Sequence, residues 1–165
     1  MQVPGPGIVE LVDQLIAESA PGRRGIDAWL ALLRAHATLV RQLALDLVEQ
    51  TGLTLGDYDV LSQLAFAGGA LRMTELADRA YSSRSGMTRR VDRLVEQGLV
   101  SRTETDADGR GVVVTLTEKG VSRFKETAPI HIRGVAELFG APLDDQELAV
   151  VERAMKKVTL KSTFG

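Results

Sequence analysis

The chain has 165 residues and a formal net charge of −2, with 20 lysines and arginines against 22 aspartates and glutamates. This length predicts one domain, and the 25% charged and 44% hydrophobic residues are ordinary for a soluble globular protein. The balanced charge excludes a protein that is basic over its whole surface, although a local basic patch stays open. The absence of cysteine excludes disulfides, thiol catalysis, cysteine zinc clusters and thiol redox sensing.

No apolar run approaches the roughly 20 residues that span a bilayer, and the first seven residues lack the basic and apolar parts of a signal peptide. We therefore expect a cytoplasmic protein with no membrane contact. Aromatic residues make up only 4% of the chain, so the core must consist mainly of leucine, valine and alanine. Such a core favours packed helices.

The first part of the chain has the apolar periodicity of helices. A helix is predicted over 8–19, where Pro21-Gly22 ends it, and a longer one over about 26–51. In the longer helix, apolar residues from Trp29 to Leu47 follow one another in steps of three and four along one face. This stripe is longer than one small core requires, so we expect the helix to pack also against another chain.

Three shorter helices are predicted next. Thr54 caps the first, with Asp57 three positions later as a near capping box, and Gly68-Gly69 ends it. Thr74 caps a short helix over about 75–81. The third runs from about 84 to 97 and stops at Gly98.

The pattern then becomes that of strands. Residues 99–105 and 111–116 are β-like runs, and the Asp108-Gly109 pair between them predicts a β-hairpin. Helices over about 117–139 and 144–161 follow, the second starting with a capping box of Asp144 and Glu147. The predicted fold is mainly α with a small β-hairpin. Residues 71–120 have the order of a helix-turn-helix followed by a wing.

The helix over 84–98 has two different faces. At 100° per residue, one side is apolar and predicted to face the core: Met87, Val91, Leu94 and Val95. The opposite side carries Ser85, Gly86, Arg89 and Arg93, with Arg90 beside them. Four arginines and one aspartate between positions 84 and 93 give a local charge of +3.

This composition suits DNA. Arginine can contact guanine through two hydrogen bonds and can also neutralise phosphate. Gly86 weakens the helix but lets its backbone approach the floor of a groove. The alternative is that the arginines form an ordinary solvated face. The turn before the helix and the hairpin after it favour DNA binding.

The hairpin tip offers a second contact. Arg110 stands on a narrow projection, where Asp108 can brace its guanidinium, and a narrow minor groove attracts such an arginine. The alternative is that Asp108-Gly109 only forms the turn and Arg110 keeps it soluble.

Four segments resemble the MarR family of winged-helix transcriptional regulators: 73–77 (MTELA), 83–102 (SRSGMTRRVDRLVEQGLVSR), 108–110 (DGR) and 116–120 (LTEKG). The resemblance extends from the long helix at residue 26 to the last helix. It implies one MarR-like domain over 1–165, with a helical dimerisation region (8–52 and 118–161) and a winged helix-turn-helix lobe (54–117). It also implies a homodimer on a pseudo-palindromic double-stranded DNA operator, acting as a transcriptional regulator and more specifically as a repressor.

By position, the resemblance implies DNA contacts on the second helix of the helix-turn-helix, at the start of the first and on the wing. These residues are Thr74, Arg84, Ser85, Gly86, Thr88, Arg89, Arg93, Asp108 and Arg110. Many members of the family have an arginine where this chain has Gly109, so the wing contact has one arginine fewer.

The resemblance also implies release by a small aromatic acid bound between the dimerisation helices and the DNA-binding lobe. The candidate wall residues are Trp29, His36, Tyr58 and Asp59, with His131 as a further candidate. The alternative is that Trp29 and His36 are core or dimer-interface residues of an apolar stripe.

Two histidines 95 positions apart, without cysteine or a phosphate-binding glycine loop, form no catalytic constellation, so we expect no enzyme, cofactor or metal. A third hypothesis is a dimeric ligand-binding or protein-interaction module without operator binding. The arginines at 84, 89, 93 and 110 argue against it.

Overall fold

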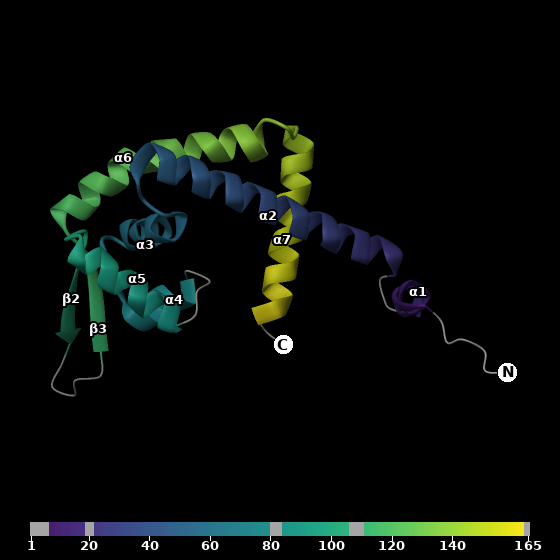
Figure 1. The fold of residues 1–165 in the computed structure, drawn as a ribbon, viewed down its shortest axis with the longest axis horizontal. Coiled ribbons are helices and arrows are strands. Elements are labelled where there is room, and N and C mark those ends of the chain that lie inside the picture. The colour runs from purple at the N-terminus through teal and green to yellow at the C-terminus, as the bar shows by residue number, and fades with distance from the viewer. Residues whose placement is uncertain (1–6, 19–21, 80–83, 106–110, 164–165) are drawn as a thin grey trace. The chain divides into compact units, whose positions relative to one another are not determined.

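The computed structural model describes residues 7–18, 22–79, 84–105 and 111–163 (Figure 1). Its helices are α1 (Ile8–Glu18), α2 (Arg23–Thr51), α3 (Leu55–Phe66), α4 (Met73–Arg79), α5 (Arg84–Glu96), α6 (Glu118–Val135) and α7 (Asp145–Thr163), with a π-helical turn, η1 (Ala136–Gly140), after α6. Its strands are β1 (Ala70–Arg72), β2 (Val100–Thr105) and β3 (Gly111–Leu116). No helix among the described residues is both long and apolar enough to cross a bilayer. The mainly helical fold with a small sheet confirms the predicted class.

The chain divides into two compact units, residues 1–42 and 43–165. Within the first unit, Arg23 at the start of α2 forms an ion pair with Asp13 of α1. The long helix begins at Arg23, three residues before the predicted start, because the carbonyl of Gly22 accepts the first helical hydrogen bonds, from the N–H groups of Gly25 and Ile26. Apolar side chains of this unit are exposed, with Trp29 at 54% and Leu33 at 43%.

One hydrophobic core holds the second unit together. The end of α2, the helices α3, α4 and α5, and the sheet all contribute to it. The buried residues of this core are Leu47, Leu53, Tyr58, Val60, Leu61, Leu64, Leu71, Leu76, Ala77, Met87, Val91, Leu94, Leu99, Val100 and Val114. Phe124, Ala128 and Ile130 of α6 pack against this cluster. The core is thus mainly leucine and valine, as the composition predicts.

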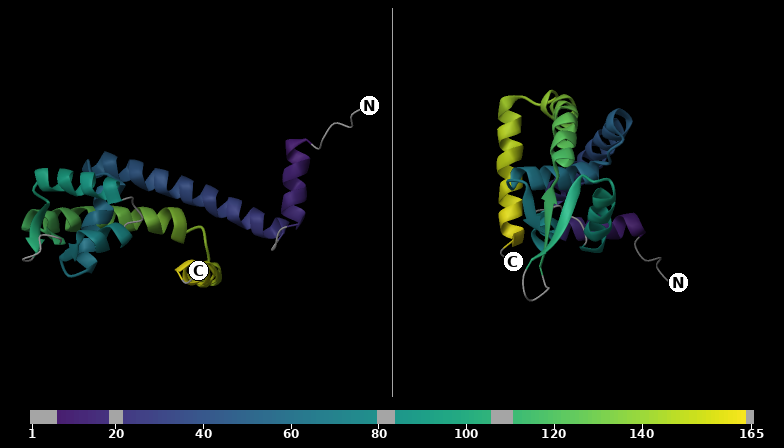
Figure 2. Two further views of the ribbon diagram at one scale, coloured as in Figure 1. Left: turned by 90° about the horizontal axis from the view of Figure 1, so that it is seen from below. Right: turned by 90° about the vertical axis from the view of Figure 1, so that its left-hand side faces the viewer.

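The sheet has three strands in the order β1-β3-β2, all antiparallel. The predicted hairpin is confirmed: β2 pairs with β3 from Val100↔Leu116 to Thr105↔Gly111, and the right-hand view of Figure 2 shows the two strands side by side. The third strand, β1, was not predicted. Its three residues are too few to display a period, and it exists because Leu71 pairs with Val114 across the sheet.

The start of α6 is fixed against the end of α5. Gly98 has a φ of 69°, which suits glycine, and lets the chain turn from α5 into β2. The Thr117 hydroxyl accepts a hydrogen bond from the Gly120 N–H (3.0 Å) and donates one to the Gly98 carbonyl (2.7 Å). A side chain at Gly120 would come within 1.9 Å of the Leu99 carbonyl oxygen, so only glycine fits there.

The last helix is capped as predicted. The Glu147 N–H donates to the Asp144 carboxylate (2.8 Å), and the Asp144 N–H donates to the Glu147 carboxylate (3.0 Å). Several apolar side chains of α7 are exposed, among them Val150 (51%), Met155 (37%) and Val158 (58%).

Candidate nucleic-acid interface

The predicted helix-turn-helix is formed by α4 and α5, which contact each other and also pack on α3 (Figure 1). The connection 80–83 between them and the connection 106–110 between β2 and β3 lie outside the described residues. The predicted wing contact Arg110, its brace Asp108 and the intervening Gly109 therefore stay predictions.

The apolar face of α5 lies in the core. Met87, Val91 and Leu94 are fully buried. Val95, predicted to share this face, is 37% exposed, because it lies at the edge of the apolar arc in the last turn of the helix. The opposite side of α5 is therefore the one directed away from the core.

The predicted DNA-contacting positions of α5 lie on that side. Thr88, Arg89 and Arg93 are exposed and Gly86 is partly exposed. Arg84 and Ser85 occupy the first turn of α5, but their side chains lie outside the description. Among the described residues, Arg89 forms no ion pair, so its guanidinium is available to a ligand.

Arg93 is engaged by an aspartate that sequence reasoning missed. Its guanidinium forms an ion pair with the carboxylate of Asp57 on α3, which is only 2% exposed. The sequence predicts Asp57 only as part of the cap of α3, and its N–H does donate to the Thr54 hydroxyl (3.1 Å). Its side chain turns the other way, toward α5.

Arg90 shares the same carboxylate. Its Nε lies 3.8 Å from Asp57 Oδ1, is buried, and has no hydrogen-bond partner among the described residues. The guanidinium lies over Gly56, where an added Cβ would come within 2.5 Å of Arg90 Cζ. One signal for this cluster was in the sequence: at 100° per residue Arg90 falls beside Met87 and Leu94, and a charge on a core face needs a buried partner.

Thr74 is displaced from its predicted role as a cap. Because α4 begins at Met73, Thr74 lies inside the first turn, where it is exposed. The N–H of Arg72 donates instead to the Glu75 carboxylate (3.0 Å), so Glu75 caps this helix. The Thr74 hydroxyl still faces solvent at the end of α4 that is predicted to approach a phosphate.

An ion pair also joins the wing strands to α5. Arg102 of β2 binds the carboxylate of Asp92 on α5. The orientation of the hairpin is therefore tied to that of the helix.

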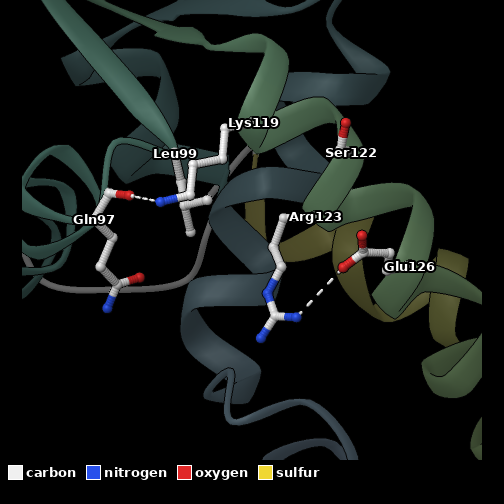
Figure 3. Close-up of a pocket in the computed structure, with 6 residues that line it drawn as sticks. All are labelled: Gln97, Leu99, Lys119, Ser122, Arg123 and Glu126. Carbon is white, nitrogen blue, oxygen red and sulfur yellow. Dashed lines mark hydrogen bonds and ion pairs between the residues drawn. The ribbon is translucent and has the colours of Figure 1, made fainter.

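A shallow pocket of about 420 Å³ lies where α5 and β2 meet α6, lined by Gln97, Leu99, Lys119, Ser122, Arg123 and Glu126 (Figure 3). Both of its cations are already engaged with carbonyl oxygens at helix ends. Lys119 Nζ donates to the Gln97 carbonyl (2.8 Å), just beyond α5, and Arg123 donates to the Thr51 carbonyl at the end of α2. Arg123 also lies 3.5 Å from Glu126. A cation at a helix C-terminus is stabilising, so these two hydrogen bonds link α6 to the ends of α5 and α2.

Two predicted effector residues, Tyr58 and Asp59, lie at the contact between α3 and α6, together with His131, the further candidate. The rings of Tyr58 and His131 are 4.5 Å apart, and Gln63 donates a hydrogen bond to Asp59 (3.4 Å). His131 Nδ1 is buried without a hydrogen-bond partner among the described residues. Tyr58, Asp59 and His131 thus form a cluster of two aromatic rings, a carboxyl group and this buried nitrogen.

Burial shifts the titration of all three groups. It lowers the pKa of His131, and the Asp59 charge partly offsets this. Burial raises the pKa of the Asp59 carboxyl, against the opposing effects of the Gln63 hydrogen bond and of Arg90 and His131. Burial and the Asp59 charge both raise the pKa of the Tyr58 hydroxyl.

The other two predicted effector residues, Trp29 and His36, lie on the part of α2 that belongs to the first unit, where both are exposed. Their share in an effector site stays a prediction.

A helix-turn-helix followed by a two-stranded wing, with a basic face on its second helix, defines a winged-helix DNA-binding protein. A family model described as the MarR family matches residues 51–111. Over this winged-helix lobe the chain is similar to the MarR family of winged-helix transcriptional regulators.

Similar proteins span most of the chain. AbsC, a MarR family regulator from Streptomyces coelicolor, has a TM-score of 0.79 and 28% identity, covering 87% of this chain and 97% of AbsC. Sco3205 from the same organism, solved in complex with DNA, has a TM-score of 0.76 and 29% identity, covering 86% of this chain and 87% of Sco3205. The transcriptional repressor MdtR of Bacillus subtilis is 33% identical over 94 residues, covering 57% of this chain and 60% of MdtR.

Proposed function

We propose that the protein is a homodimeric cytoplasmic repressor that binds a pseudo-palindromic operator in double-stranded DNA. It represses by occupying the operator and catalyses no reaction. The observation that carries this proposal is the helix α5, which buries Met87, Val91 and Leu94 and directs Arg89 away from the core. A helix held by one face in this way presents the other to the major groove. The complex of Sco3205 with DNA and the naming of MdtR as a repressor support the proposal.

We assign the DNA contacts as follows. Arg84, Ser85, Gly86, Thr88 and Arg89 on α5 face base edges and adjacent phosphates. Thr74 contacts a phosphate through its hydroxyl, and Arg93 neutralises the backbone. In the wing, Arg110, braced by Asp108, enters the minor groove.

We assign residues 54–117 to the DNA-binding lobe, and 8–52 with 118–161 to dimerisation. The apolar side chains that one chain leaves exposed support this division, notably Leu33 on α2 and Val150 and Met155 on α7. Exposed apolar side chains in such number mark an interface with another protein.

We also propose that a small aromatic acid releases the operator. The cluster of Tyr58, Asp59 and His131 supplies an aromatic wall, and His131 Nδ1, which lacks a partner among the described residues, can hydrogen-bond to such a ligand. Trp29 and His36 are the candidates from the dimerisation helices.

Selection of bound duplexes from random DNA tests the proposed function. The expected result is enrichment of a two-fold symmetric sequence whose half-sites lie about 10 base pairs apart or a multiple of it. Binding without enrichment of any sequence would favour the alternative of a ligand-binding or interaction module.

A further inference from the structure

We propose that Asp57 determines the DNA specificity of this protein without contacting DNA, by fixing how α5 presents its arginines. This inference rests on the proposed operator binding. It arises from one buried carboxylate on α3 that faces two guanidiniums of the DNA-contacting helix.

Asp57 is buried. Its side chain is only 3% exposed, and a carboxylate removed from water must be paired. Both of its charged partners, Arg90 and Arg93, lie on α5, more than 30 positions along the chain. The carboxylate is therefore built to hold α5, not to stabilise its own helix.

The surface of α3 beside Asp57 is shaped for an arginine. Gly56 leaves room for the Arg90 guanidinium, since any Cβ there would lie 2.5 Å from Cζ and Nη2. Gly56 thus provides space for the Arg90 guanidinium, and Asp57 provides the negative charge that pairs with it and with Arg93.

The side chain of Arg93 is 46% exposed although it is paired. One edge of its guanidinium is bound to Asp57, and the rest reaches the surface. An arginine whose planar head is fixed can bond to a phosphate in one geometry only, whereas a free one can follow any phosphate. Fixing Arg93 therefore sets the register of α5 on the duplex.

The pairing also weakens binding to arbitrary DNA. Non-specific affinity follows the number of cations free to neutralise phosphate. One carboxylate between two arginines reduces the net charge of that flank from +2 to +1, while Arg89 forms no ion pair among the described residues. Asp57 thus lowers general attraction and preserves the contact that discriminates bases.

The test compares Asp57→Asn with Glu96→Gln in the full-length protein. Glu96 lies at the end of α5, is exposed and has no ion pair among the described residues, so its replacement removes the same charge without breaking a pair. Each variant is first shown to be folded by thermal unfolding. Dissociation constants are then measured for the selected operator and for a scrambled duplex at several salt concentrations.

The two explanations predict opposite changes in operator affinity for Asp57→Asn. If Asp57 acts only as a negative charge near DNA, Asp57→Asn strengthens binding to both duplexes, as Glu96→Gln does. If it positions α5, Asp57→Asn weakens operator binding about tenfold, the loss expected for one good contact. Binding to the scrambled duplex then stays the same or tightens, and its salt slope steepens by about one unit. An operator-to-scrambled ratio equal to that of Glu96→Gln would overturn the proposal.

A second variant keeps the proposal testable if Asp57→Asn fails to fold. Arg93→Lys retains the charge but loses the planar head, so the ratio should fall while the salt slope is unchanged. A wild-type ratio in Arg93→Lys would overturn the proposal. A wild-type protein that does not discriminate the two duplexes would overturn operator binding itself, whereas discrimination preserved in both variants overturns only the role of Asp57.

Discussion

Arginines of one helix have different tasks in this protein, and only their surroundings distinguish them. The sequence places Arg89 and Arg93 on one face of α5, but the structure pairs Arg93 with Asp57 and leaves Arg89 without an ion pair among the described residues. The helical period predicts which way a side chain leaves its helix. It cannot predict a partner that lies on another helix, which is why Asp57 was missed.

Arg89→Ala should weaken operator binding by about 1–3 kcal/mol and relax the preference at one base position, because arginine is the usual partner of guanine in the major groove. Fluorescence anisotropy with the selected operator and its single-base variants measures both effects. Unchanged affinity and base preference would show that the exposed face of α5 is not the DNA-contacting one.

Gly120→Ala should destabilise the fold by about 1–3 kcal/mol, because its Cβ would overlap the Leu99 backbone carbonyl, which cannot move without breaking the α5–β2 turn. Gly134→Ala is the matched control on the same helix. There the added Cβ meets only the end of the Leu43 side chain, at 2.8 Å, which can rotate away. Urea unfolding compares the two, and equal losses would contradict this account.

The elements were predicted best where a local sequence signal marks at least one end. The hairpin β2–β3 has its turn sequence between two β-like runs, and α7 has its capping box, and both were found in the structure. The start of α4 and the strand β1 were not predicted, because a distant or competing group decides each: Glu75 reaches back to Arg72, and β1 depends on pairing with β3. Local patterns carry no information about such partners.

The contact of α3 with α6 predicts a pH dependence of stability. Because burial lowers the pKa of His131, the folded state favours the neutral imidazole. Its contribution is complete above the ordinary pKa of about 6.5 and is lost as the pH falls toward the lowered value. His131→Gln should therefore lose less stability than wild type between about pH 7 and pH 5.

Asp59→Asn is the control with the opposite sign. The raised pKa of Asp59 makes the folded state bind its proton more tightly, so this group adds stability as the pH falls through the raised value. Removing the carboxyl should make the acid-side loss steeper, as measured by thermal unfolding across the same range. Parallel curves for wild type and His131→Gln would mean that His131 is hydrated in solution.

At the scale of the whole molecule, the apolar surface of one chain predicts a dimer. Leu33 of α2 and Val150, Met155 and Val158 of α7 are all more than a third exposed in the single chain. We expect a two-fold interface above the roughly 2,000 Å² typical of obligate pairs. Light scattering should give twice the monomer mass of 17.8 kDa at micromolar concentration. Met155→Glu should shift the mass toward the monomer, whereas a monomeric wild type would contradict the dimer.

An aromatic carboxylate should release the protein from its operator. A ligand can change operator affinity only if it binds the DNA-incompetent arrangement of the dimer more tightly than the competent one. A coupling of about 1–3 kcal/mol would lower operator affinity some 5- to 150-fold, and DNA must weaken ligand binding by the same factor. Titration of benzoates and hydroxybenzoates, with the fluorescence of the single tryptophan, Trp29, and operator binding followed together, measures both sides.

His131→Gln should reduce the effect of the ligand more than it reduces operator binding without ligand, because His131 Nδ1, beside Tyr58, has no hydrogen-bond partner among the described residues. Compounds that change Trp29 fluorescence without changing DNA affinity would show a pocket that is not a switch. If no compound in a broad panel changes either Trp29 fluorescence or DNA affinity, Trp29 and His36 serve interface packing. Operator occupancy would then be set by the amount of protein present, because this chain has no cysteine thiol to oxidise.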